Sequence, residues 1–77
     1  MKITYTVHAE MKIAKRGILK TYIETVLKSP DKLLDAKDGR KIAQKVVKKH
    51  LIRVVFEEDG NAYKVVTAYY SKPERYG

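Results

Sequence analysis

The chain has 77 residues, 17 of them basic and nine acidic, with a formal net charge of +8, 44% hydrophobic residues and no cysteine. These values predict a single domain over residues 1–77, and they exclude disulfides, thiolate metal sites and thiol catalysis. The charge favours a nucleic acid, an acidic protein or an anionic membrane as the partner. No apolar run approaches the ~18 residues of a membrane span and no signal peptide is recognisable, so we expect a cytoplasmic protein without membrane contact.

The first part of the chain predicts a strand followed by a helix. Residues 2–7 alternate polar and apolar side chains, which is typical of a half-buried strand. From His8 to Arg16 the apolar positions recur with a helical period, and Gly17 is suited to the left-handed conformation that ends a helix.

A second helix is expected from Thr21 onward. Thr21 and Glu24 have the spacing of a capping box, in which each side chain bonds the backbone N–H of the other at the start of a helix. Pro30 disfavours helical geometry at Ser29, so the helix should end there. The apolar stripe of this helix is formed by Ile18, Tyr22, Ile23, Val26 and Leu27.

The second half of the chain predicts four strands joined by short turns. The strands are expected over residues 32–36, 40–47, 51–56 and 62–70. Asp38-Gly39 is a strong hairpin signal, residues 48–50 form a basic turn, and the acidic residues 57–61 form a loop. The fold class is therefore α+β, with the order β-α-α-β-β-β-β and two N-terminal helices packed on one face of a small antiparallel sheet.

Two tyrosines follow one another in the last predicted strand. Because successive side chains of a strand point to opposite faces, we expect one of Tyr69 and Tyr70 in the core and the other at the surface. The chain must leave the sheet at this edge before Pro73, which cannot continue a central strand, so we expect Tyr70 to point outward.

Positive charge is concentrated in the first part of the chain. Residues 1–56 contain 14 Lys or Arg and five Asp or Glu, whereas residues 57–77 contain three and four. The basic residues form two clusters, which are Lys12-Lys15-Arg16 and Lys45-Lys48-Lys49-Arg53. We expect Lys45 and Arg53 to approach each other across a hairpin, and such clusters are suited to binding phosphates. The alternative is that these lysines only solvate an exposed surface.

Several motifs occur in a fixed order along the chain. They are His8-Ala9-x-Met11-x-x-Ala14-x-Arg16-Gly17-Ile18, Ile23-x-x-Val26-Leu27-x-x-Pro30, Asp38-Gly39-Arg40, Leu51-x-Arg53-Val54-Val55-Phe56 and Val65-Val66-Thr67-Ala68-Tyr69. With them the chain resembles, over about residues 3–76, a family of short prokaryotic domains of unknown function. It departs from that family at Leu19, Lys20 and Thr21, where the family has a serine cap and acidic residues at the start of the second helix.

That family is similar in layout to the RelE/ParE/BrnT-type toxins. The resemblance implies a RelE-like fold, in which two N-terminal helices pack against a small antiparallel sheet. In the RelE-like ribonucleases, Lys, Arg and Tyr residues of the sheet face and the C-terminal tail hold and cut messenger RNA. ParE-type members with the same fold act on gyrase and are not ribonucleases, so the layout alone does not decide the chemistry.

Cleavage of RNA through the ribose 2′-hydroxyl needs proton-transfer groups and cations around the phosphate. The candidate catalytic residues are His8, because imidazole is a common general acid and base, Tyr70, through its hydroxyl, and Arg75, through its guanidinium. The alternative for His8 is a local hydrogen bond at the start of a helix. The candidate nucleic-acid-binding residues are Lys12, Lys15, Arg16, Lys45, Lys48, Lys49, Arg53 and Lys72. His50 is expected to be solvent-exposed, and neither a metal site nor a cofactor is expected.

Two functions remain open at this point. The first is a toxin-type, metal-independent endoribonuclease that binds RNA on a basic sheet face. The second is a non-catalytic module that binds nucleic acid or a protein, for which an acidic antitoxin is one candidate. A catalyst should lose turnover but retain RNA affinity when its site is neutralised, whereas a binder loses affinity as cations are removed. We expect a monomer or a homodimer.

Overall fold

The computed structural model describes residues 2–72 as two helices and five strands. In chain order they are β1 (Lys2–Tyr5), α1 (Val7–Arg16), α2 (Lys20–Lys28), β2 (Lys32–Asp35), a 3-10 turn (Lys37–Gly39), β3 (Lys41–Val47), β4 (His50–Asp59) and β5 (Ala62–Ser71). The predicted α+β class and the order β-α-α-β-β-β-β are confirmed. Within the described chain, neither helix has the length and apolar character that crossing a membrane requires.

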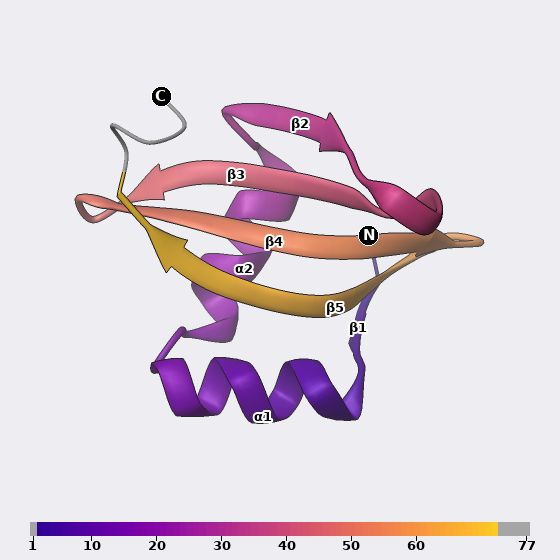
Figure 1. The fold of residues 1–77 in the computed structure, drawn as a ribbon, viewed down its shortest axis with the longest axis horizontal. Coiled ribbons are helices and arrows are strands. Elements are labelled where there is room, and N and C mark those ends of the chain that lie inside the picture. The colour runs from indigo at the N-terminus through magenta and orange to yellow at the C-terminus, as the bar shows by residue number, and fades with distance from the viewer. Residues whose placement is uncertain (1, 73–77) are drawn as a thin grey trace.

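The strands form one sheet in the order β1-β5-β4-β3-β2. Strands β2 to β5 form an antiparallel meander, as predicted, but β1 runs parallel to β5 and makes the sheet mixed. In Figure 1, α2 lies behind the sheet and α1 runs below β5. The sequence did not predict this parallel pairing. Hairpin signals reveal pairings between strands that follow one another, whereas β1 and β5 lie at opposite ends of the chain.

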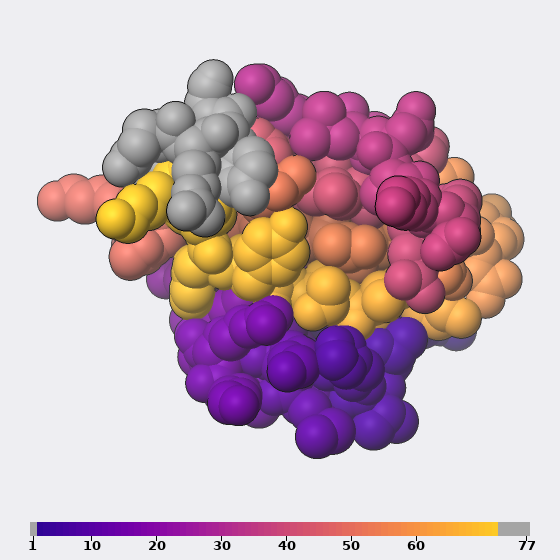
Figure 2. Space-filling view, in the orientation of Figure 1, coloured from indigo at the N-terminus to yellow at the C-terminus, as the bar shows by residue number. Residues whose placement is uncertain are grey.

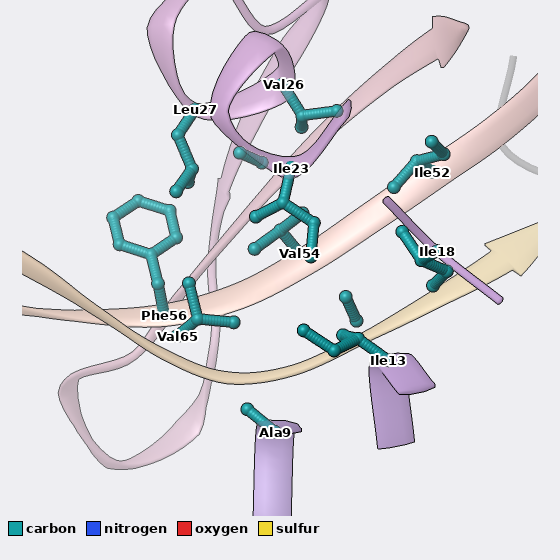
Figure 3. Packing of buried hydrophobic residues seen from close by; sticks show 12 residues of the cluster. Ala9, Ile13, Ile18, Ile23, Val26, Leu27, Ile52, Val54, Phe56 and Val65 are labelled. Carbon is teal, nitrogen blue, oxygen red and sulfur yellow. The ribbon is translucent and has the colours of Figure 1, made fainter. Parts of the chain in front are cut away.

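A single apolar core lies between the helices and the sheet. Its fully buried members are Ala9, Ile13, Ile18, Ile23, Val26, Leu27, Ala43, Ile52, Val54, Phe56, Val65 and Ala68. Figure 3 shows Ile23 of α2 close to Val54 of β4, with the ring of Phe56 below Leu27. The predicted apolar stripe of α2 is confirmed, although Tyr22 is only partly buried. Both helices therefore pack on the same face of the sheet.

Thr6 separates β1 from α1. Its backbone N–H donates to the carbonyl of Val65 at 3.0 Å, and its Oγ1 accepts from the N–H of Ala9 at 3.0 Å as the N-cap of α1. The predicted strand over residues 2–7 is therefore too long, because Val7 already belongs to the helix and is exposed. The end of α1 is as predicted, since Gly17 has a φ of 68° and caps the helix.

The start of α2 differs from the prediction. The capping box of Thr21 and Glu24 does not form, because the helix begins at Lys20 and its N-cap is Leu19, which makes no side-chain cap. Thr21 lies inside the helix, where its carbonyl accepts from the hydroxyl of Thr25 at 2.9 Å. Burial of Ile18 fixes where the chain turns into α2, and this tertiary contact overrides the local capping signal.

The acidic segment that follows Phe56 is strand rather than the predicted loop. Strand β4 continues to Asp59, and only Gly60 and Asn61 form the turn to β5. Glu57 bonds Arg40 of the chain entering β3 at 2.9 Å, and Glu58 bonds Lys41 at 3.0 Å. These cross-strand ion pairs neutralise the charge of the acidic side chains, which by themselves favour a loop.

Strand β5 contains a bulge that sets its register against β4. Val55 lies opposite Thr67 but Phe56 lies opposite Val65, so Val66 has no partner on β4. The extra residue allows Val65 and Ala68 both to face the helices with no exposed surface, although strict alternation would separate them. Beyond the bulge, Tyr70 lies opposite Ile52 on the helix-covered face, and Tyr69 lies opposite Arg53 on the other.

Candidate functional site

One end of the molecule collects basic and aromatic side chains from three segments. The segments are the last turn of α1, the turn between β3 and β4, and the C-terminal end of β5, which lie together at the left of Figure 1. We call this surface the basic end and define it as Lys15, Arg16, Lys48, Lys49, His50, Tyr70 and Lys72, all of which are exposed. Figure 2 shows the β3–β4 turn projecting at this end beyond the other elements.

Tyr70 connects these segments. Its hydroxyl donates to the carbonyl of Gly17 at 3.4 Å, and its ring centroid lies 5.2 Å from that of His50. Beside it, Nη1 of Arg16 donates to the carbonyl of Ala68 at 2.7 Å. These contacts hold the end of α1 against the edge of β5. Strand β1 does not pair with this part of β5, so the helix end covers an edge that would otherwise be open.

The cations of the basic end are not neutralised by the described acidic residues. The salt bridges among residues 2–72 are Lys20–Glu10, Arg40–Glu57, Lys41–Glu58, Lys45–Asp31 and Lys64–Glu57. None of these pairs contains Lys15, Arg16, Lys48, Lys49 or Lys72. The acidic pair Glu57 and Glu58 lies at the opposite end of β4, so the charge of the domain is polarised along the sheet.

Two of these lysines have an unfavourable backbone conformation. Lys48 has a φ of 52° and Lys49 a φ of 72°, so both residues of this hairpin turn are left-handed. Such turns favour Asn-Gly or Asp-Gly, because a side chain in this conformation costs on the order of 1 kcal/mol. The β2–β3 hairpin of the same chain has the favourable pair, Asp38 with a φ of 62° and Gly39 with 73°. Folding alone does not explain two lysines at this turn.

Three predicted binding residues lie outside the basic end. Lys12 is in the middle of α1, and Lys45 bonds Asp31 at 3.4 Å. Arg53 is only 8% exposed and lies on the face opposite the helices, with its guanidinium 5.8 Å from the ring of Tyr69. The expected approach of Lys45 to Arg53 is wrong, because Lys45 lies opposite Ile52 and the two side chains point to opposite faces.

The predicted catalytic residues are not brought together among residues 2–72. His8 is exposed in the first turn of α1, whereas Tyr70 contacts Gly17 beyond the last turn. The helix between them spans about 13 Å at 1.5 Å per residue. Arg75 lies outside the described residues. The imidazole beside Tyr70 is that of His50, which we expected only to be exposed.

His50 is the residue that the sequence alone did not connect with the site. Strand pairing places it two residues before Ile52, the partner of Tyr70, on the same face of the sheet. The basic turn beside His50 is the feature of the sequence that could have indicated its place in the site. Its contact with Tyr70, however, depends on the bulge in β5. Residues 2–72 contain no group of three or more His, Asp or Glu side chains that could hold a metal ion.

Two carboxylates of the described chain, Asp31 and Glu57, predict an acid-dependent stability. The N–H of Val46, followed by Lys45, lowers the pKa of Asp31, and the Arg40 guanidinium lowers the pKa of Glu57. A carboxyl group with a lowered pKa stabilises the fold above its ordinary value of about 4, and this contribution is lost as the pH falls through the folded-state pKa. We expect the melting temperature to fall as the pH is lowered below about 4, and to fall less in Asp31→Asn, as followed by calorimetry. An equal fall in both proteins would contradict this.

The fold and the site define a small α+β domain with a polarised charge and one basic, aromatic end. Residues 5–70 match the family described as Domain of unknown function (DUF4258), and the chain belongs to this family. The resemblance to a family of short domains of unknown function is therefore confirmed. No curated protein and no solved structure matches the chain, and the RelE-like relationship stays a prediction.

Proposed function

We propose that this domain binds nucleic acid at its basic end, with RNA as the first ligand to test. One observation carries the proposal. Lys48 and Lys49 occupy both left-handed positions of a hairpin turn, at a cost in stability, beside three further cations without an acidic partner among residues 2–72. A turn of this type gains stability from Asn-Gly, so the two lysines are better explained by a polyanionic ligand.

The three segments of the basic end suit a ligand that carries several phosphates. Arg16 binds the carbonyl of Ala68 through Nη1, which orients the guanidinium and leaves its other donors for a phosphate. Lys48, Lys49 and Lys72 add single charges on exposed side chains at the same end of the domain. Contacts from separate segments favour a chain of phosphates over a single small anion.

We propose binding without cleavage. General acid–base catalysis needs proton-transfer groups at one phosphate, and the pair predicted for it, His8 and Tyr70, lies at opposite ends of α1, which leaves His50 as the imidazole to test beside Tyr70. We expect end-labelled RNA to remain intact when it is incubated with the purified protein in a metal chelator. Metal-independent cleavage that is lost in His50→Ala would instead support a ribonuclease, with His50 in the role predicted for His8.

Binding should depend strongly on salt. We expect the logarithm of the association constant for a 12-nucleotide RNA to fall with the logarithm of the salt concentration, with a slope of about −3.5 for five phosphate contacts at about −0.7 each. Fluorescence anisotropy between about 50 and 300 mM potassium chloride, a range that includes physiological ionic strength, measures this slope. No binding at the lowest salt would overturn the proposal and leave an acidic protein as the partner to test.

A further inference from the structure

We infer that the ligand at the basic end is single-stranded, with an unpaired base stacked on the rings of Tyr70 and His50. This inference rests on the proposed function, because it specifies the form of nucleic acid that the basic end takes. The observation behind it is separate, since it concerns the two aromatic rings and not the charges.

The two rings lie among the cations of the basic end. Tyr70 is 36% exposed, and His50 is exposed beside it with a centroid separation of 5.2 Å and an interplanar angle of 53°. Because the two rings are tilted, they do not cover each other fully, and both residues keep exposed surface. Aromatic rings within a basic surface bind unpaired bases by stacking, whereas a duplex keeps its bases inside.

The position of Tyr70 is fixed before any ligand binds. Its hydroxyl bonds the carbonyl of Gly17 at 3.4 Å, and its backbone lies in β5 opposite Ile52 of β4. A tyrosine held in this way loses little conformational freedom on binding. Tyr70 is not a member of the hydrophobic core cluster, so its exposed surface is not needed for core packing.

The experiment compares three probes of equal charge by fluorescence anisotropy competition. They are a single-stranded RNA, an RNA duplex and inorganic polyphosphate, which has no bases. We expect Tyr70→Leu to weaken single-strand binding about 5- to 100-fold, in the range for one stacked base, and to leave polyphosphate binding within about twofold. Tyr70→Phe, which retains the ring and loses the hydroxyl bond to Gly17, is the matched comparison and should keep most of the single-strand affinity that Tyr70→Leu loses.

A second measurement needs no variant. In proton NMR of the wild-type protein, the ring resonances of Tyr70 and His50 should shift upfield with single-stranded RNA but not with polyphosphate. Unchanged single-strand affinity in Tyr70→Leu, or an equal preference for the duplex, overturns the inference. If binding still falls in a variant that lacks Lys48 and Lys49, the proposed function stands. If neither variant loses affinity, both proposals fail.

Discussion

Replacing Lys48 and Lys49 by asparagine and glycine is expected to stabilise the protein and to weaken its binding of nucleic acid. Asn-Gly is the preferred pair for a turn with two left-handed residues, and Lys48 and Lys49 have φ values of 52° and 72°. Relief of this backbone strain should raise the free energy of unfolding by about 1 kcal/mol and the melting temperature by about 4–8 °C. Most substitutions act in the opposite direction.

The same exchange removes two phosphate contacts. At about 0.7 to 0.9 of salt slope for each contact, affinity at 0.1 M salt should fall roughly 25- to 60-fold, and the slope should become shallower by about 1.4 to 1.8. A matched control removes the same charge at the other end through Lys37→Gln and Lys64→Gln. Glu57 retains Arg40 at 2.9 Å in that control. Equal losses of affinity in both variants would assign the effect to net charge and contradict a site at the basic end.

Phe56→Ala is expected to produce the largest loss of stability. The ring is 2% exposed and lies 4.8 Å from the ring of Tyr63, and Figure 3 shows it between Leu27 of α2 and Val65 of β5. Truncation of a buried phenylalanine costs about 3–5 kcal/mol, because the cavity closes only partly. A domain of this size has a total stability on the order of 4–11 kcal/mol, so the variant should lose between about a third and all of it.

Urea denaturation followed by circular dichroism measures this loss. Met11→Ala is the control, because Met11 is 66% exposed on α1 and its truncation should change stability by less than about 0.5 kcal/mol. A loss below about 1 kcal/mol in Phe56→Ala would show that β4 and α2 do not share the close-packed core described above.

Local sequence determined the elements whose signals lie within a few residues. Gly17 ends α1 because it adopts a positive φ without a side-chain clash, and Asp38-Gly39 forms the β2–β3 hairpin for the same reason. Alternation of apolar side chains predicted the strands over residues 2–7 and 40–47, and β-branched and aromatic composition predicted those over 51–56 and 62–70, since both are properties of consecutive residues. The basic character of the surface was equally evident, because it follows from composition.

Strand pairing and core burial determined the structure at the positions where the predictions from local sequence were wrong. Glu57 and Glu58 indicate a loop by themselves, but Arg40 and Lys41 on the adjoining segment make them cross-strand partners and extend β4 to Asp59. The start of α2 likewise follows the burial of Ile18 instead of the local capping signal. In both cases the deciding partner is distant in sequence or belongs to the core, so a local pattern does not contain it.

The bulge in β5 decided the composition of the site. The two-residue turn of Gly60 and Asn61 pairs Asp59 with Ala62, and continued without interruption this register would place Tyr69 opposite Ile52. The unpaired Val66 shifts the register by one residue and places Tyr70 there instead, beside His50 and Gly17. The sequence by itself determined that this domain is basic and contains two adjacent tyrosines. Only the tertiary structure decided which tyrosine joins the basic end, because a shift of one residue reverses every side chain between the two faces of a sheet.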